Sequence, residues 1–259
     1  MQKRNFNITL GAETICIRYK YPGLTMENII LLLETATESC SVALCNSENI
    51  IAEKYINEPK SHASLLARYI QDILTENNLT IHDCAAVAVS EGPGSYTGLR
   101  VGVSCAKGLC YGASKPLIGV GTLNTIAQCA IDNNLINSNN PSEPYLIVPM
   151  IDARRMEVYT ATFTSDGKAL SETKALILTE ECFKEELERG KVLFTGNGAE
   201  KFRTLVNHPN AVFAEQLPHA SGMRVIASDM LNKKEFKDIA YFEPFYLKDF
   251  VAGKPKKLL

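Results

Sequence analysis

The chain has 259 residues, of which 46% are hydrophobic and 22% charged, and its formal net charge is −2. These values predict a globular protein with enough buried surface for one large domain or two smaller ones. The balanced charge excludes a protein that binds nucleic acid through a basic surface spread over the whole molecule, while a local basic patch stays open.

Cysteine usage and hydropathy indicate where the protein works. None of the eight cysteines forms a Cys-x-x-Cys pair, and a chain of this length does not need disulfides to fold. No stretch approaches the roughly 18 apolar residues of a membrane span. We therefore expect reduced cysteines that serve as small core residues, in a cytoplasmic protein with no membrane partner.

Residues 1–25 precede Met26, which opens the apolar run Ile29 to Leu33, a natural first strand. The apolar pieces before Met26 are short and interrupted, unlike the continuous core of a secretory signal. The pattern favours a poorly ordered N-terminal extension, or a true start at Met26. An added strand made from Thr9 to Arg18 is the alternative.

The first half of the chain predicts three strands, a helix, a strand and a second helix. The strands are expected at 29–33, 41–45, 50–56 and 85–89, and the helices at 63–76 and 97–113. A glycine-rich loop, Glu91 to Gly98, joins the last strand to the last helix. Backbone N–H groups at a helix N-terminus commonly hold anions. The loop has no Gly-Lys-Ser/Thr ending, however, and its glycine spacing departs from the Rossmann pattern.

The second half repeats this plan. Strands are expected at 146–151, 157–164, 169–178 and 192–195, the last followed by a Gly-x-Gly loop and a helical segment. The offset that aligns Glu34 with Asp152 also places the turn at 47–49 on the turn at 165–167. The repeat predicts duplicated α/β domains at 26–117 and 118–259, the second ending in a basic tail. Chance similarity of short meanders is the alternative.

An acid at the end of a first strand, a three-stranded meander and a duplicated domain resemble the superfamily of actin, hexokinase and heat-shock chaperone ATPases (ASKHA). That resemblance implies two RNase H-like domains that hold ATP between them, with strand-end acids holding magnesium-bound water. The candidate phosphate-loop residues are Glu34, Thr35, Gly92, Gly94, Asp152, Gly196 and Gly198. The first hairpin carries no glycine and Glu38 would repel a phosphate, which indicates degenerate loops. Acids that only cap turns are the alternative reading.

The stretch Glu91 to Arg100 resembles the signature of the bacterial TsaB family, formerly called YeaZ. Segments at 33–44, 115–123, 152–159 and 246–257 resemble other parts of that family, so the resemblance covers about residues 26–259. It implies the dimerisation subunit of the machinery that makes threonylcarbamoyladenosine beside the tRNA anticodon. The implied partners are the transferase TsaD, in a heterodimer, and the ATPase TsaE, which docks onto the pair. The resemblance also implies that ATP and metal are bound by the partner subunits and that this chain meets tRNA through the complex. In the absence of TsaD, two copies of this chain can form a homodimer.

The chain lacks the residues for metal catalysis. The catalytic relative TsaD carries a His-x-x-x-His pair after the domain junction, and histidines at that spacing share a helix face and can chelate a metal. Thr122 and Ile126 stand at the matching positions, and the four histidines are scattered. We expect no catalytic residue and no metal ligand, which argues against a metalloprotease. An independent ATP-using kinase or hydrolase of the superfamily is the alternative function.

The two helices of the first half carry more apolar surface than one buried face needs, since a one-sided surface helix requires an apolar arc of about 100°. The candidate partner-interface residues are Leu65, Leu66, Tyr69, Ile70, Ile73, Gly98, Val101, Gly102, Cys105, Ala106 and Leu109. Gly98, Gly102 and Ala106 are spaced by four, which would let another backbone approach closely. The TsaB resemblance places the heterodimer on these helices. Two helices buried in one large core are the alternative.

Basic residues carry a weaker signal. Arg154, Arg155 and the tail lysines could contact tRNA phosphates. Solvated surface charge is the favoured reading of both groups.

Overall fold

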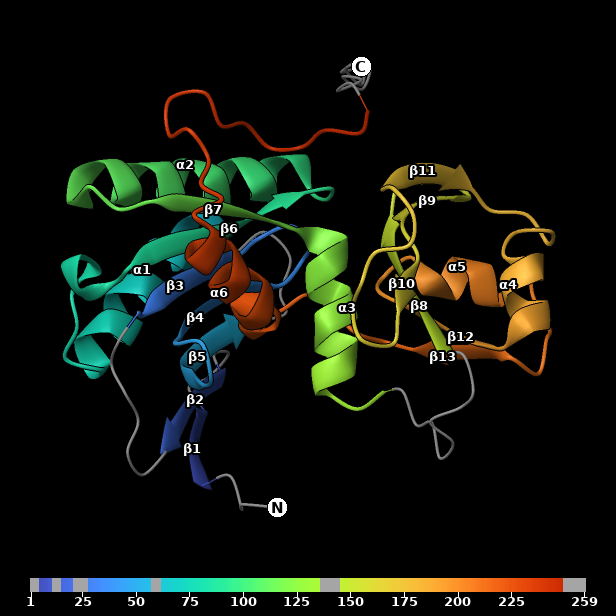
Figure 1. Cartoon of the computed structure of the whole chain (residues 1–259), viewed down its shortest axis with the longest axis horizontal. Coiled ribbons are helices and arrows are strands. Elements are labelled where there is room, and N and C mark those ends of the chain that lie inside the picture. The colour runs from blue at the N-terminus through green and yellow to red at the C-terminus, as the bar shows by residue number, and fades with distance from the viewer. Residues whose placement is uncertain (1–4, 11–14, 21–27, 57–61, 136–144, 249–259) are drawn as a thin grey trace, which may run out of the picture.

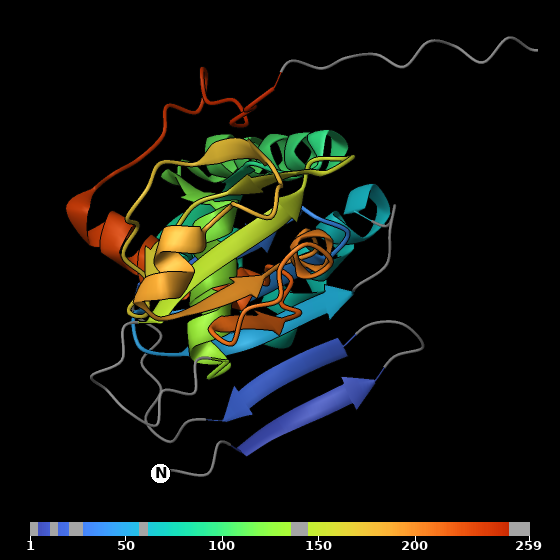
Figure 2. The same cartoon turned by 90° about the vertical axis from the view of Figure 1, so that its right-hand side faces the viewer.

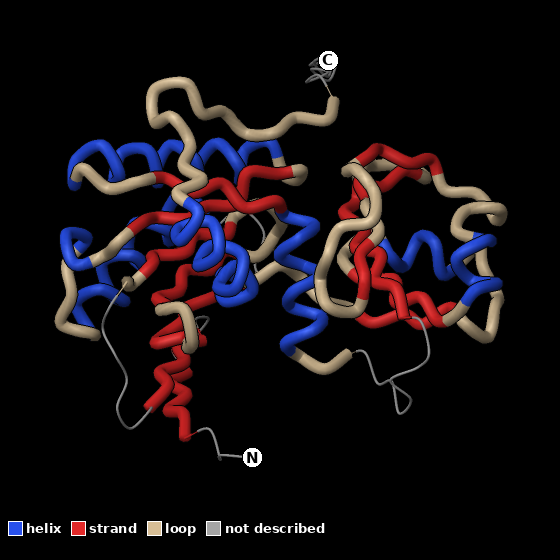
Figure 3. The backbone as a smooth tube through the Cα atoms, in the orientation of Figure 1, coloured by secondary structure: helices blue, strands red, loops and turns tan. Residues whose placement is uncertain are grey.

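The computed structural model describes residues 5–10, 15–20, 28–56, 62–135 and 145–248. These residues form two sheets with helices on their faces, and helix α3 stands between the two sheets (Figures 1 and 3). The first sheet has seven strands in the order β1-β2-β5-β4-β3-β6-β7. Its strands are β1 (Asn5–Leu10), β2 (Ile15–Lys20), β3 (Ile30–Glu34), β4 (Cys40–Cys45), β5 (Ile50–Ile56), β6 (Ala86–Gly92) and β7 (Leu117–Gly121).

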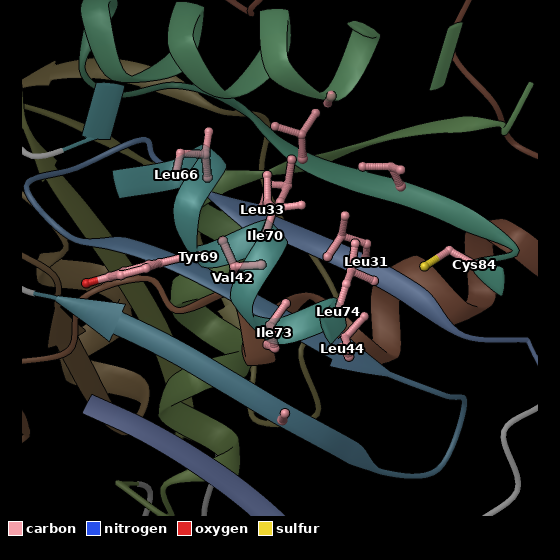
Figure 4. Close-up of a cluster of buried hydrophobic side chains, with 14 of the residues drawn as sticks. Leu31, Leu33, Val42, Leu44, Leu66, Tyr69, Ile70, Ile73, Leu74 and Cys84 are labelled. Carbon is pink, nitrogen blue, oxygen red and sulfur yellow. The ribbon is translucent and has the colours of Figure 1, made fainter. Parts of the chain in front are cut away.

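The first sheet is buried on both faces because its central strands β3, β4 and β6 are apolar at most positions. Along β3, Leu31 and Leu33 lie in one core and Ile30 and Leu32 in another, as expected where successive side chains alternate across a sheet. Figure 4 shows the first of these cores, which lies between the sheet and two helices. The helices are α1 (His62–Glu76) and α2 (Tyr96–Ala113) on that face, with α6 (Arg224–Lys233) and the 3-10 turn η2 (Ala220–Met223) on the other.

The second sheet has six strands, five of them in the order β11-β9-β8-β12-β13, with β10 paired to β8. Its elements are β8 (Tyr145–Asp152), β9 (Glu157–Thr160), β10 (Phe163–Thr164), β11 (Lys174–Ile177), β12 (Lys191–Thr195) and β13 (Ala211–Ala214), with helices α4 (Lys184–Arg189) and α5 (Ala199–Arg203). One face packs on α3 (Thr122–Asp132) through Ile126 and Ile147. The other packs on α4 and α5, where Phe194 and Phe202 lie with ring centroids 4.8 Å apart.

The two sheets share one topology, which confirms the predicted duplication. The shared part leaves out the β1–β2 hairpin and β10 and has five strands in each sheet. The earliest of the five, β3 or β8, is central, and the next two follow it antiparallel in a meander. The last two run parallel to the central strand on its other side. Thus β8 takes the place of β3, β12 that of β6 and β13 that of β7. The fold is therefore α/β, with two domains of one duplicated, RNase H-like strand order.

The structure departs from the predicted boundaries in three places. Residues 5–10 and 15–20 form a hairpin that extends the first sheet beside β5 (Figure 2), where the sequence favours a poorly ordered extension and offers an added strand as the alternative. The predicted boundary at 117/118 falls inside β7, which belongs to the first sheet. Residues 220–233 also return to that sheet as η2 and α6, because Ala220, Met223 and Ala227 fill the core on its second face.

Candidate partner interface and degenerate phosphate loops

The glycine loop between β6 and α2 packs directly against the β3–β4 hairpin. The Ser95 N–H donates to the Ala36 carbonyl at 2.6 Å, and the Thr35 hydroxyl donates to the Gly98 carbonyl at 2.8 Å. A Cβ at Gly94 or Gly98 would lie far inside van der Waals contact with the carbonyl oxygens of Ala36 and Thr35. The glycines therefore allow backbone to approach backbone, and the N–H of Ser95 already has a protein acceptor.

The other side of the loop is covered by the segment Glu235 to Lys248, which we call the strap. The Phe245 N–H donates to the Glu91 carbonyl at 2.7 Å, and Lys237 Nζ lies 2.7 Å from Glu91 Oε2. A Cβ at Gly92, whose φ is +117°, would lie 2.7 Å from the Phe245 carbonyl oxygen. The β3–β4 hairpin covers one side of the loop and the strap covers the other. The loop therefore does not fit a phosphate group.

Glu34 ends β3 inside the protein. Glu34 is 0% exposed. Its Oε1 accepts the Ala36 N–H at 2.6 Å, and its Oε2 has no hydrogen-bond partner among the described residues. Burial raises the pKa of Glu34 to about 7, against which hydrogen bonds from Ala36, Ser90 and Thr35 act. A carboxyl group buried in this way does not fit the role of holding hydrated magnesium, which requires an open, ionised acid.

Asp152, the matching acid of the second domain, is exposed but already has a cation. Lys201 Nζ lies 2.8 Å from Asp152 Oδ1, which also accepts the Arg154 N–H at 2.6 Å. Asn197 then joins the two domains: its Oδ1 accepts the Asp152 N–H at 3.0 Å, and its Nδ2 donates to Glu38 Oε2 at 3.2 Å. Protein groups thus occupy the place where the superfamily resemblance puts a magnesium–phosphate pair.

The second glycine loop repeats the packing of the first. A Cβ at Gly196 would collide with the Met150 carbonyl oxygen, and one at Gly198 would lie 3.0 Å from the Ile151 carbonyl carbon. The Gly198 N–H donates to the same Met150 carbonyl at 2.9 Å. The seven predicted phosphate-loop residues therefore lie at two equivalent sites, each made of the end of the first strand and the glycine loop beside it. At both sites the donor set fits close backbone packing and not ATP with magnesium.

The described residues hold no cluster of three or more His, Cys, Asp or Glu side chains that could bind a metal. Thr122 and Ile126, at the positions of the missing histidine pair, are both 0% exposed. Burial raises the pKa of the Cys40 and Cys45 thiols to about 12, so neither is a thiolate nucleophile at neutral pH. No described helix is both long and apolar enough to cross a membrane.

The structure corrects much of the predicted partner interface. Seven of its residues are buried within the chain itself, mostly in the core between the first sheet and the helices: Leu66, Tyr69, Ile70, Ile73, Gly98, Gly102 and Ala106. A Cβ at Gly102 would collide with the Thr35 hydroxyl oxygen, so the stripe Gly98–Gly102–Ala106 serves the close packing of α2 on its own domain. For these residues the alternative of one large core is the correct reading.

The remaining four predicted residues, Leu65, Val101, Cys105 and Leu109, are half-buried at the edge of that core. Beside them runs a surface that sequence reasoning missed, which we call the α1–α2 face. It comprises the exposed Ser64, Ala67, Arg68, Gln71 and Thr75 of α1 and Ser104, Gly108, Tyr111 and Gly112 of α2. This face is open: a Cβ at Gly108 or Gly112 would meet nothing within 4 Å, and the Tyr111 side chain beside them is 82% exposed.

The α1–α2 face has the properties of a helix-packing surface. Ser104, Gly108 and Gly112 are spaced by four, which places three small residues in one row along the helix. Small residues in such a row let a second backbone come close, and neighbouring half-buried apolar side chains supply area to bury. The only signal in the sequence was this second row of small residues, which lies on a different face of α2 from the predicted row Gly98–Gly102–Ala106.

The chain is similar to proteins of one family. The model of the family described as TsaD: tRNA N6-adenosine threonylcarbamoyltransferase matches residues 49–255. The chain is 35% identical to the tRNA threonylcarbamoyladenosine biosynthesis protein TsaB of Escherichia coli over 87% of this chain and 96% of that protein. It is 30% identical to TsaB of Haemophilus influenzae over 88% of this chain and 98% of that protein.

A solved structure gives the same result at the level of the fold. The structure named YeaZ from Pseudomonas aeruginosa matches with a TM-score of 0.73 and 24% identity, over 85% of this chain and 100% of that chain. The identity to the two TsaB relatives, over nearly their whole length, and the family match over residues 49–255 show that the chain belongs to the TsaB (YeaZ) family.

Proposed function

We propose that this chain is a non-catalytic partner subunit in the synthesis of threonylcarbamoyladenosine on tRNA. The E. coli and H. influenzae relatives carry this biosynthesis in their names, and the family model is that of the transferase TsaD. The chain would form a heterodimer with TsaD, and TsaE would dock on the pair. Its work on tRNA places it in the cytoplasm.

The observation that carries this proposal is the α1–α2 face. A row of three exposed small residues runs along α2 at Ser104, Gly108 and Gly112, and a Cβ at either glycine would meet nothing within 4 Å. A second pair of helices, on TsaD or on a second copy of this chain when TsaD is absent, would bury the row together with Val101 and Cys105. Helix pairs at such close contact gain stability from dispersion and from apolar area removed from water.

The alternative of an independent ATP-using kinase or hydrolase is disfavoured by the phosphate loops. Lys201 pairs with Asp152, Glu34 is buried, and both glycine loops pack against their own first strands. We therefore propose that this chain alone binds neither ATP nor metal. A metalloprotease is disfavoured further, since Thr122 and Ile126 replace the histidine pair.

The test is reconstitution of tRNA modification with Gly108→Arg. Arginine at 108 has open space in the monomer and a better helix propensity than glycine by roughly 0.5–1 kcal/mol, so the variant should fold. We expect it to lose co-purification with TsaD and the threonylcarbamoyl transfer that depends on it. Asn232→Arg, which adds the same side chain to the exposed surface of α6, is the matched control. Normal pairing of Gly108→Arg would refute the interface, and transfer by this chain without TsaD would refute the non-catalytic role.

A further inference from the structure

The strap links the two domains on one side of the molecule. It leaves α6, passes along α2 and reaches the second domain (Figure 1), where Lys248 forms an ion pair with Glu157. Lys107 Nζ holds the strap on α2 by donating to the Ala240 and Phe242 carbonyls at 3.1 and 3.0 Å. Residues from both domains therefore lie along one continuous path that the strap defines.

An aromatic–arginine cluster marks the first-domain end of this path. The Arg100 guanidinium lies 4.2 Å from the centroid of the Tyr96 ring, and its Nε donates to the Tyr246 hydroxyl at 3.2 Å. The rings of Tyr96 and Tyr246 are 5.1 Å apart and tilted by 39°. Arg100 and Tyr246 are exposed and Tyr96 is half-buried, so the cluster presents a guanidinium group and the Tyr246 ring to solvent. Among the described residues, no carboxylate is in ion-pair contact with Arg100.

Two consecutive arginines mark the second-domain end. Arg154 and Arg155 form the tip of the turn between β8 and β9, with φ values of 69° and 49°. The Ala153 N–H donates to the Glu157 carbonyl at 3.1 Å, which closes the turn. Two residues with positive φ in a tight hairpin are usually Asn-Gly, because larger side chains resist that backbone conformation. Two exposed arginines at such a position indicate that their side chains have a use there.

The charges around this path leave the arginines in excess. Three of the nearby carboxylates have a lysine partner: Asp152 with Lys201, Glu157 with Lys248 and Glu91 with Lys237. Glu243 acts on Arg100 electrostatically but lies outside ion-pair distance among the described contacts. Only Leu247 separates Tyr246 from Lys248, which leaves at most about 7 Å of extended chain between them, so both ends belong to one local surface.

We propose that this surface binds single-stranded RNA, with Arg154 and Arg155 on backbone phosphates and the Tyr96–Arg100–Tyr246 cluster stacking an unpaired base. The inference rests on the proposed function, which supplies a tRNA with an unpaired anticodon loop as the RNA. Unpaired bases are recognised by stacking on aromatic rings and on guanidinium planes, and phosphates by arginine. Arg100 stands four residues before Ser104 on α2, at the N-terminal edge of the α1–α2 face, whereas Tyr246 and the two turn arginines lie outside that face. RNA would therefore bind along the border of the partner interface.

The test measures binding of unmodified tRNA to the assembled complex of this chain with TsaD, over a range of salt concentrations. Arg154→Asn with Arg155→Gly creates the preferred turn sequence, so folding is kept while two cations are removed. We expect affinity to fall about 10–100-fold and the slope of log affinity against log salt to become shallower by about 1–2. Tyr246→Ala should lower affinity about 5–100-fold with little change in the slope, because it removes stacking. Glu243→Gln should raise the affinity.

The control is Lys184→Asn with Arg189→Asn, which removes two exposed positive charges from α4 at the far end of the second domain (Figure 1). Unchanged affinity and salt slope in the turn variant would overturn the inference, as would an equal loss in the control. If the turn and Tyr246 variants instead fail to assemble with TsaD, the surface is a protein contact and the inference is wrong. Absence of any complex with the wild-type chain would refute the proposed function itself, which separates the two failures.

Discussion

Replacing Glu34 by glutamine should make the protein more stable at neutral and alkaline pH but not at acidic pH. The carboxyl group is 0% exposed and Oε2 has no hydrogen-bond partner among the described residues, so ionisation places an incompletely compensated charge in the core. Burial raises the pKa of Glu34 from 4.5 to about 7 in the folded state. Glutamine keeps an oxygen that can accept the Ala36 N–H and cannot ionise.

The sign and size of the effect follow from linkage. Between pH 4.5 and 7 the unfolded chain releases this proton more readily than the folded one, so the free energy of unfolding falls as pH rises through that window. Below the window both states hold the proton and the wild type bears no penalty. Above it, a difference of roughly 2.5 pKa units corresponds to about 3 kcal/mol. The glutamine variant should therefore gain about 3 kcal/mol over the wild type at pH 8, or roughly 6–12 °C in Tm.

Urea unfolding of both proteins at pH 4.5, 6 and 8 measures this difference directly. We expect nearly equal midpoints at pH 4.5 and a gap that widens with pH, at an unchanged slope of unfolding free energy against urea. Glu48→Gln, at an exposed position in the β4–β5 turn, is the control and should show no such widening. A gap that is constant with pH, or a glutamine variant that is less stable at pH 8, would contradict the account of Glu34.

Three further outcomes are expected. Gly98→Ala should lose about 1–3 kcal/mol of unfolding free energy in urea, because its Cβ overlaps the Thr35 carbonyl oxygen, whereas Gly108→Ala should gain about 0.5–1 kcal/mol; equal effects would count against the assigned packing. Asn197→Ala should cost about 1–2 kcal/mol and raise amide exchange at the domain junction, since it removes the hydrogen bond to Glu38; unchanged exchange would be evidence against a domain clasp. Calorimetry of the isolated chain with ATP and magnesium should show no saturable heat, and tight binding would favour the kinase or hydrolase alternative.

The sequence predicted the strands well because each apolar run is bounded by polar or turn residues. Ile50–Ile56 is a strand with the expected bounds, and helices at 63–76 and 97–113 are displaced by one residue at their starts. The expected strand at 157–164 is broken into β9 and β10, and helix α3 and strand β13 were not predicted. The repeated order of elements was enough to give the duplicated topology, since it depends on succession along the chain and not on contacts.

The face of a helix that meets the core could not be predicted in the same way. Gly98 and Gly102 approach Thr35, which lies more than 60 residues earlier, and no local pattern encodes that contact. A row of small residues spaced by four reads the same whether it meets the chain's own hairpin or a partner. For this reason Gly102→Arg should unfold the chain, and Gly108→Arg is the informative variant.

The strap was also hidden from sequence reasoning. Tyr246 hydrogen-bonds to Arg100, from which it is separated by 146 positions in the sequence. Lys201 likewise pairs with Asp152 from 49 positions away. The sequence showed an acid at the end of each first strand, but it did not show that Lys201 pairs with Asp152 or that burial raises the pKa of Glu34. Degeneracy of the phosphate loops was predicted from a missing glycine and an added Glu38 and stays a prediction; the sequence did not show which protein groups pack against these loops.

Amide hydrogen exchange of this chain, with and without TsaD, tests the central claim most directly. Pairing through the α1–α2 face predicts slower exchange in residues 64–76 and 100–112 when TsaD is added, with little change in β11 or α4 of the second domain. Protection confined to the second domain, or none at all in a complex shown to be intact, would contradict the claim that this face holds the partner.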